Sequence, residues 1–338
     1  MTRATVAVRF QGGPMPNPPS EAEVLGFHEL LSNWGRWGDD DQLGTLNYIT
    51  PEVRRRAATL VREGLTVSCA WDLSTMPQEG DVFGPVHRFM VMTGEGLGDP
   101  HRVQPPHPIE GIDGSRFAGA AEYMGFVFHG VNVTHVDALS HVFWDRQTYN
   151  GGPAELVNAM FGATNLAVTG MREGIVTRGV LVDVPAARGV DWLEPGEGVH
   201  PDDLEAAEQR QGVRIGEGDA VLLRTGYARR KREVGPVPMH EGQPGWHASS
   251  LPWLHERRVA AIGCDTAQDV VPSGYAQMPL PVHIVGMVAM GLCLIDNCDL
   301  EELAATCARL GRSEFLFTLA PLRLTGGTGS PANPLATF

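Results

Sequence analysis

The segment 126–141 constrains this sequence more than any other, because apolar residues there alternate with three histidines and an aspartate. Such alternation predicts a β-strand, in which every second residue points to the same face. His129, His135 and Asp137 would then share one face. In an extended chain the Cα atoms of His135 and Asp137 are about 6 to 7 Å apart, so both side chains can reach one ion at about 2 Å. The segment therefore predicts a metal site. The alternative is that His135 and Asp137 only hydrogen-bond each other or nearby backbone.

Two ligands hold an ion weakly, so a metal site needs further ligands from elsewhere in the sequence. His129 and His141 are candidates on the same segment. A second candidate pair lies much later in the chain. His283 precedes an apolar run that a glycine ends, which predicts a short buried helix, and Asp296 ends the next apolar run. Each is ambiguous alone, because a histidine at a helix start often caps or packs and an aspartate before an asparagine often forms a turn.

The charge and cysteine content exclude several classes of protein. A net charge of −14 and a pI near 5.3 disfavour nucleic acid and anionic membranes as partners, because both attract clustered Lys and Arg. Five cysteines without a Cys-x-x-Cys pair fit neither a disulfide framework nor a thiolate zinc site. No secretory leader pattern is present, and the longest apolar stretch, 279–295, is too short to span a bilayer. We therefore expect a cytoplasmic protein that binds neither nucleic acid nor membrane.

Glycines and prolines punctuate the start of the chain, which predicts an extended N-terminal arm over 1–25 and a single domain over 26–338. Thr50 and Pro51 predict a helix start, with the helix running to residue 63. Asp299 and Glu302 have the spacing of a capping box, which predicts a helix over 299–310. A further helix is expected over 201–211, and strands over 179–184, 220–225, 259–263 and 315–319.

Strands and helices therefore intermix, which favours an α/β or α+β domain over a helix bundle or a β-sandwich. The segment 80–120 is rich in glycine and proline. It is either a cover that faces the substrate or an ordinary surface excursion.

The run Thr134-His135-Val136-Asp137-Ala138-Leu139-Ser140-His141 resembles the signature of the cyclase-like metal-dependent hydrolases, the family of bacterial kynurenine formamidase and isatin hydrolase. Weaker similarities to this family lie before and after the motif, in one order along the chain, at 41–47, 178–183, 224–226 and 263–266, and at His283. The resemblance implies an α/β fold in one domain, with a mixed β-sheet or flattened barrel flanked by helices (the swivelling β/β/α type). It also implies a homodimer or homotetramer.

The resemblance implies roles for the polar residues as well. His135 and Asp137 match metal ligands, His141 resembles the proton-transfer residue, and His283 and Asp296 would complete the site. One family ligand is missing, because Val131 stands where the family has a histidine. His129 lies two residues earlier, and on a regular strand it would be roughly 20 Å from His135 unless a bulge or loop near Gly130 shortens the path.

Asp296 stands where the family usually has the longer glutamate. Together with Val131, this departure leaves a dinuclear site, a mononuclear site and a site without metal all open.

These features together lead us to expect a metal-dependent hydrolase. Its metal-activated water would cleave a C–N bond of an amide, formamide, lactam or imide. Zn or Mn would suit the ligands, which do not distinguish between the two ions. Trp71, Trp144 and Tyr149 are candidate walls for a small aromatic or cyclic substrate, unless they serve core packing. The alternatives are a metal-dependent cyclase or dehydratase, and a non-catalytic ligand-binding relative that has lost its metal.

Overall fold

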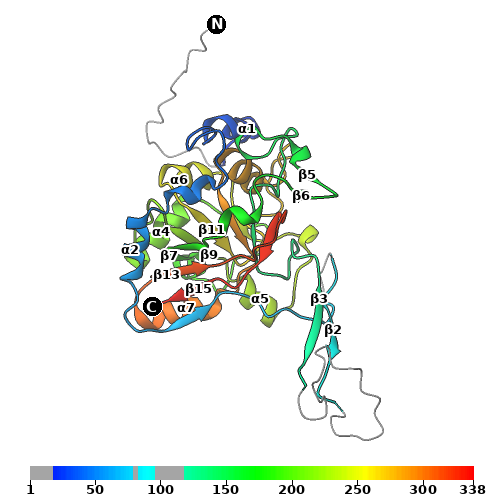
Figure 1. Cartoon of the computed structure of the whole chain (residues 1–338). Helices are drawn as coiled ribbons and strands as arrows, with labels where there is room; N and C mark the ends of the chain where they lie inside the picture. Colours follow the sequence, from blue (N-terminus) through cyan, green and yellow to red (C-terminus); the bar gives the residue numbers. More distant parts are fainter. Residues whose placement is uncertain (1–17, 79–82, 96–117) are drawn as a thin grey trace, which may run out of the picture.

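A mixed nine-stranded β-sheet forms the centre of the structure (Figure 1). The computed structural model describes residues 18–78, 83–95 and 118–338. In spatial order the strands are β1 (Thr66–Ser68), β15 (Leu335–Thr337), β13 (Glu314–Leu319), β7 (Ile175–Asp183), β9 (Ala220–Arg224), β11 (Ala261–Cys264), β12 (Cys293–Asp296), β4 (His135–Asp137) and β14 (Gly329–Pro331). The strands β7, β9, β11 and β12 run parallel, and the flanking strands are antiparallel. The predicted mixed α/β sheet is confirmed.

The sheet is buried on both faces because helices cover each of them. One face packs against α1 (Glu21–Leu30), α3 (Val184–Arg188), α4 (Pro201–Gln211), α6 (Ser250–Glu256) and the π-helix η6 (Val282–Met290). The other face packs against α2 (Pro51–Ala58) and α7 (Glu301–Leu310). The central strands β9, β11 and β12 are therefore buried along their whole length, as in other parallel sheets covered by helices. The strands β1, β13 and β15 instead alternate between buried and more exposed residues.

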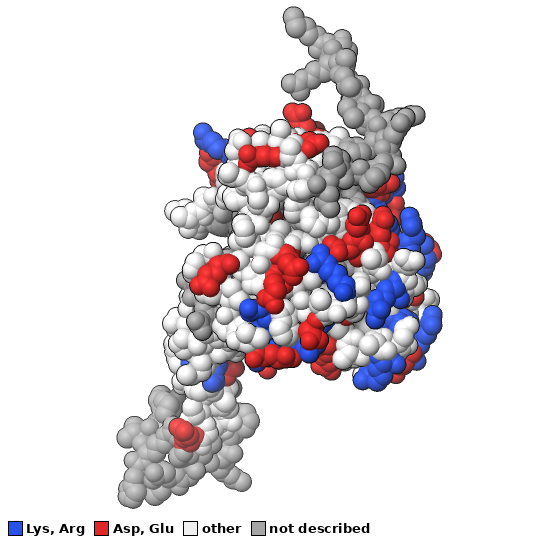
Figure 2. Space-filling view, turned by 180° about the vertical axis from the view of Figure 1, so that it is seen from behind, with Lys and Arg blue, Asp and Glu red and all other residues white. Residues whose placement is uncertain are grey.

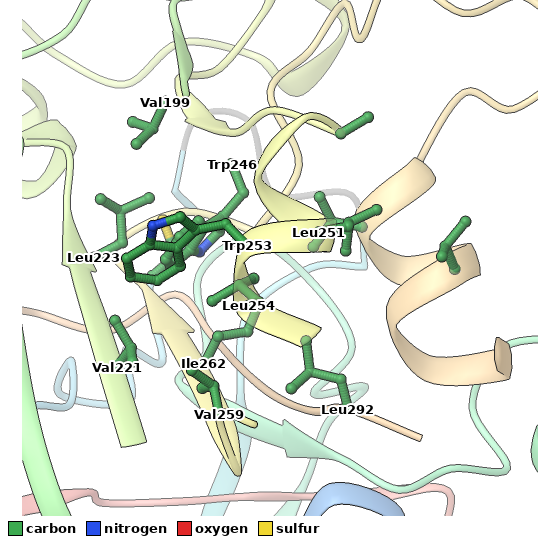
Figure 3. Packing of buried hydrophobic residues seen from close by; sticks show 14 of the residues in the cluster. Val199, Val221, Leu223, Trp246, Leu251, Trp253, Leu254, Val259, Ile262 and Leu292 are labelled. Atoms are coloured by element: carbon green, nitrogen blue, oxygen red, sulfur yellow. The ribbon is translucent and has the colours of Figure 1, made fainter. Parts of the chain in front are cut away.

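Neighbouring residues of one strand enter opposite cores, as the pleat requires. On β9, Val221 and Leu223 face the first core, whereas Leu222 faces the second. Figure 3 shows the first core, in which Trp246 and the α6 residue Trp253 lie beside Leu223.

Shorter elements complete the described chain. Three strand pairs lie outside the main sheet: β8 (Gly198–Val199) with β10 (Gly245–Trp246), β2 (His87–Met92) with β3 (Ala121–Gly125), and β5 (Val157–Asn158) with β6 (Gly162–Ala163). The remaining helices are α5 (Tyr227–Glu233) and the 3-10 turns η1 (Gly44–Tyr48), η2 (Tyr149–Gly151), η3 (Ala154–Leu156), η4 (Val168–Met171) and η5 (Met239–Glu241).

Most predicted helices and strands are present, and the errors lie at their ends. The Thr50 side chain caps α2 as expected, but that helix ends at Ala58. The capping box predicted for Asp299 is wrong, because α7 begins at Glu301 and the Asp299 carboxylate pairs with Arg232. The predicted extended arm is wrong for residues 21–25, because Ser20 caps helix α1 there. Residues 1–17 lie outside the described residues.

The segment 80–120, predicted as either a cover or a surface excursion, lies partly outside the described residues. Its described part contains β2, which pairs with β3 just after the segment, and this hairpin projects from the body of the molecule (Figure 1). Phe89 and Tyr123 stack on this hairpin with ring centroids 4.8 Å apart, and both rings are exposed. Acidic and basic side chains are interspersed on the face shown in Figure 2. Among the described residues, no helix is both long enough and apolar enough to cross a bilayer.

The double-sided burial of the sheet predicts a large cost for truncating its central strands. Leu223→Ala removes a side chain that is 0% exposed, and we expect a loss of about 2 to 5 kcal/mol of unfolding free energy. Denaturant unfolding would measure it. Leu322→Ala is the matched control, because Leu322 is 57% exposed and its loss should change stability by less than about 0.5 kcal/mol. Equal effects of the two substitutions would contradict the two-core arrangement.

Candidate metal centre

The pairing of β4 with β12 brings the two halves of the candidate site together. These strands are antiparallel neighbours, and His135 lies directly opposite Asp296 in their register. Directly opposed residues of an antiparallel pair point to the same face. Their neighbours Val136 and Ile295 enter the second core, so His135, Asp137 and Asp296 face the side covered by the π-helix.

His283 approaches the same place from the first turn of the π-helix. Its Nε2 atom lies 3.5 Å from Asp296 Oδ2 and 3.9 Å from Asp137 Oδ2. The predicted short buried helix after Pro281 is confirmed, and Gly291 ends it in the left-handed conformation. Residues from two distant parts of the sequence therefore converge, as expected.

Asp269 holds His283 in one orientation. The Asp269 carboxylate accepts hydrogen bonds from the backbone N–H groups of Val282 and His283 and from His283 Nδ1, the last at 2.6 Å. Because a carboxylate accepts, Nδ1 carries the proton in neutral His283, and the Nε2 lone pair faces Asp137 and Asp296. Burial lowers the pKa of His283, but Asp269 and Asp296 outweigh it and raise that pKa well above its usual value.

His135 is fixed in the same way. Its Nδ1 lies 2.8 Å from the carbonyl oxygen of Val133, so Nδ1–H donates and Nε2 is left with a lone pair. That Nε2 lies 3.6 Å from Asp137 Oδ1 and 3.9 Å from Asp296 Oδ2. In their neutral forms, His135 and His283 thus each direct a lone pair at the two carboxylates inside a buried site.

His129 reaches the site because the chain bends between it and His135. The prediction of one extended strand is wrong for residues 126–134, since only His135–Asp137 form β4. The Gly130 N–H donates to the Phe128 carbonyl in a tight turn, and the loop alternative near Gly130 is confirmed. His129 Nε2 lies 3.3 Å from Asp137 Oδ1, and its ring centroid is 5.3 Å from that of His135. His129 therefore lies in the site and offers a ligand atom, which the Val131 side chain lacks.

Two residues outside the predicted set shape this bend. The Asn297 side chain donates to the carbonyl oxygens of Gly130 and Val133 at 2.7 and 3.3 Å, which fixes the loop. Gly329 on β14 leaves room for the imidazole, because a Cβ there would lie only 2.6 Å from His129 Nε2. Neither role has a signal in the sequence, since both depend on contacts between distant segments.

Asp137 is the centre of the cluster. Both of its carboxylate oxygens are buried, and neither has a hydrogen-bond partner in the described part of the chain. Burial alone would raise the pKa of Asp137, but His141, His129, His135 and His283 together hold it well below the usual range. An unpartnered buried carboxylate is costly, and a cation is the partner that such oxygens and neutral imidazoles share. The residues present therefore fit a divalent metal ion.

The ligand atoms form two groups of three that share Asp137. One group is His135, Asp137 and Asp296, and the other is His129, Asp137 and His141, each with its atoms within 4.8 Å of one another. His141 stacks on His129 with ring centroids 3.9 Å apart. Burial lowers the pKa of His141, and the charge of Asp137 opposes that shift. His141 therefore lies where it can bind an ion or exchange protons.

Gln268 orients Asp296. Its amide nitrogen donates to Asp296 Oδ1 at 2.9 Å and to the Ile295 carbonyl oxygen at 2.8 Å. One oxygen of Asp296 is thereby engaged, and Oδ2 is left facing His135 and His283. Gln268 and Asp269 are consecutive, so one loop positions both late members of the site. Sequence reasoning missed this loop, although it directly follows the weak motif at 263–266.

The three predicted aromatic walls have different positions. The expectation that Tyr149 lines a substrate site is wrong, because the residue is 1% exposed and its hydroxyl donates to Asp41. Tyr149 therefore serves packing. The Trp71 ring lies on the cations of Lys231 and Arg232, at 4.9 and 4.5 Å. Trp144 packs partly buried against the first core. Substrate contact by Trp71 and Trp144 stays a prediction.

The motif at 41–47 anchors the π-helix. Asp41 accepts hydrogen bonds from the N–H groups of Leu43 and Gly44 and from Tyr149. Gly44 lies against Gly291, where a Cβ would be 2.1 Å from the Gly291 carbonyl oxygen. This contact fixes the end of the helix that carries His283.

Comparison with known proteins gives a consistent picture. The family model described as putative cyclase matches residues 65–268. A solved structure described as a novel cyclase is 34% identical, with a TM-score of 0.81, and the match covers 92% of this chain and 99% of that one. A comparison with curated proteins found no match.

Two further solved structures are more distant. Isatin hydrolase A from Labrenzia aggregata is 20% identical with a TM-score of 0.56, covering 83% of this chain and 94% of that one. Isatin hydrolase A from Ralstonia solanacearum is 21% identical with a TM-score of 0.55, covering 85% and 97%. At this identity they show a shared fold.

The space left by Gly329 generates one prediction. Gly329→Ala should displace His129 from Asp137 and press on the Val136 carbonyl oxygen, which would lie 2.7 Å from the new Cβ. Zn binding should weaken, by about 10-fold if the loss resembles other damaged metal shells. Competition against a chromophoric chelator would measure the affinity. Gly26→Ala in α1 is the matched control, because nothing lies within 4 Å of a Cβ there. Unchanged Zn affinity in a folded Gly329→Ala protein would exclude His129 from the site.

The Asp269 contacts generate a second prediction. Asp269→Asn keeps the shape but weakens the acceptor that fixes the His283 tautomer, so Zn affinity should fall by about 10- to 100-fold. Asp191→Asn is the control, since Asp191 is exposed and pairs only at the surface with Arg229. Equal Zn affinity in the two variants would mean that His283 is not a ligand.

Proposed function

Because this chain belongs to the putative cyclase family, we propose that it is a metal-dependent hydrolase that cleaves a C–N bond of an amide, formamide, lactam or imide with water. The carrying observation is the buried convergence of the His135 and His283 lone pairs on the carboxylates of Asp137 and Asp296. A site of this composition suits a cation, because packing alone does not require buried carboxylates beside imidazoles.

His135, Asp137, His283 and Asp296 would hold the ion, with His129 as a further ligand. Zn and Mn both suit these donors. When bound, such an ion lowers the pKa of water toward about 7 and polarises a carbonyl oxygen. Asp269 and Gln268 keep two of the ligands oriented, which removes the cost of ordering them when the ion binds.

His141 would carry protons in this reaction. Its lowered pKa keeps the imidazole neutral near pH 7, so it can accept a proton from the attacking water. The same group can return that proton to the leaving nitrogen as the C–N bond breaks. Its ring is only partly buried, unlike those of His135 and His283.

The substrate would be a small molecule with an amide-type bond. Two structural neighbours are named isatin hydrolase, which makes a cyclic amide the first compound to test. Two small cavities, of about 10 and 20 Å³, adjoin this region, and each has room for about one water molecule. One is lined by Asp137, Leu139, Leu166 and Cys293 among others, and the other by Phe126, Gly130, Asn132 and Val133 among others.

Two further proposals concern the setting of the enzyme. We propose a cytoplasmic location, which is supported by five buried, free thiols that suit a reducing compartment. We also propose a homodimer or homotetramer, supported by the exposed aromatic hairpin of β2 and β3, since a lone hairpin is marginally stable in water. Light scattering would give the mass, and a monomer at micromolar concentration would contradict this proposal.

The reaction type can be tested with labelled water. Incubating the Zn- or Mn-loaded protein with isatin or formanilide in H₂¹⁸O should place one ¹⁸O atom in the new carboxylate, which mass spectrometry detects. A metal-dependent cyclase or dehydratase would give product without the label. Failure to turn over any amide, formamide, lactam or imide in a panel would favour the ligand-binding alternative.

The assigned roles predict a contrast between two variants. Asp137→Asn should lower metal content and activity together, because it removes a charge from the centre of the cluster. His141→Ala should retain most of the metal and lose about 10²- to 10⁴-fold in kcat, the usual range for a general acid–base residue. Metal analysis and kinetics on the same preparations would measure both. Full activity and metal content in both variants would overturn the assignment.

A further inference from the structure

A second cluster of histidines lies outside the metal centre, beside a cavity of about 420 Å³ that opens to solvent. His200 precedes α4, and His247 follows β10. Their rings are 4.3 Å apart, and Ser249 lies between them. The proposed hydrolytic mechanism uses none of these residues. The cavity is lined by Pro18, Gly196, Gly198, His200, His247, Val270, Pro272, Ser273 and Gly274.

The hydrogen bonds of this cluster form a chain in which each group donates to the next, and the chain ends at the carbonyl oxygen of Pro19. The Tyr275 hydroxyl donates to the Pro19 carbonyl oxygen at 3.0 Å, so its oxygen can only accept from His247 Nε2–H at 3.3 Å. A neutral His247 with Nε2 protonated has a lone pair on Nδ1. The backbone N–H of Ser249 points at that Nδ1 from 3.2 Å, which agrees with the assignment.

The same chain of hydrogen bonds extends from His247 through Ser249 to His200 at the cavity. The Ser249 hydroxyl lies 2.9 Å from His247 Nδ1 and 3.0 Å from His200 Nδ1. Its single proton goes to the His247 lone pair, so the Ser249 oxygen accepts from His200 Nδ1–H. A neutral His200 then has its remaining lone pair on Nε2, beside Gly198 at the cavity wall.

Both histidines are neutral near pH 7. Burial lowers the pKa of His247 to about 4, with His200 adding to the shift. Burial also lowers the pKa of His200, where Asp203 and Arg188 act in opposite directions. The cavity therefore presents a fixed hydrogen-bond acceptor rather than a charge.

We propose that this cavity is a second ligand site, which takes a small uncharged ring compound that carries an O–H or N–H donor, such as a phenol or an azole. The donor would bond to His200 Nε2. The ring would lie on Val270, Pro18 and Pro272, and the glycines at 196, 198 and 274 add stretches of wall without side chains. Anions are disfavoured, because Arg188 is already paired with Glu197 and Asp203.

Phenol and anisole form a matched pair of probes, because they share the ring and differ in the donor. In ¹⁵N-histidine-labelled protein, the His200 resonances should show Nδ1 protonated and Nε2 bare, and phenol should shift the Nε2 signal. Phenol should bind about 3- to 10-fold more tightly than anisole, the range expected for one hydrogen bond. Equal binding of the two compounds, or a His200 protonated on Nε2, would overturn the proposal.

Variants test the same residue independently. His200→Leu should remove the preference for phenol over anisole, whereas the control His240→Leu should keep it, because His240 is exposed and outside the cavity. If His200→Leu fails to fold, Gly198→Ala provides a second variant. Its Cβ would lie 3.1 Å from His247 Cβ and 3.4 Å from His200 Nε2, so it should shift His247 and weaken phenol binding at the neighbouring His200. Retained phenol preference in either folded variant would also overturn the proposal, whatever the catalytic activity.

Discussion

The structure depends on one electrostatic constraint, which is that the carboxylates of Asp137 and Asp296 are buried facing two imidazole lone pairs. Nε2 of His135 lies within 4 Å of both carboxylates, and so does Nε2 of His283. Without a proton or a cation between them, anionic oxygens and imidazole lone pairs repel each other, and burial removes the water that would otherwise solvate them. The raised pKa of His283 reflects the same demand for positive charge. A bound cation turns every one of these contacts into an attraction. The candidate metal follows from this arrangement, independently of any relative.

The fold creates that arrangement at the point where its sheet changes direction. The parallel strands end with β12, and the antiparallel β4 adds to its edge. Asp296 at the end of β12 is thereby set opposite His135. The π-helix just before β12 carries His283 onto the same face. Two apolar cores hold the sheet from both sides, so the ligands are positioned by rigid elements rather than by loops alone.

The sequence contained enough information for the ligands but not for what holds them. His135 and Asp137 were predictable because they match a specific motif. His283 and Asp296 stand at the borders of apolar runs and were weak candidates until the resemblance joined them to that motif. The position of His129 was predictable only as an alternative, since a two-fold alternation indicates a strand even where the chain turns at Gly130. Asp269, Gln268 and Asn297 hold ligands or loops through contacts between distant segments, which leave no periodic pattern. Tyr149 was a candidate for both substrate contact and packing, because aromatic character alone does not distinguish a pocket wall from a packed core residue.

Anomalous X-ray diffraction from crystals grown with Zn tests the central claim most directly. The account predicts an anomalous peak bound by Nε2 of His135 and His283 and by the carboxylates of Asp137 and Asp296. Crystals with excess Zn that show no peak there, with protonated histidines bonded directly to the two carboxylates, would contradict it.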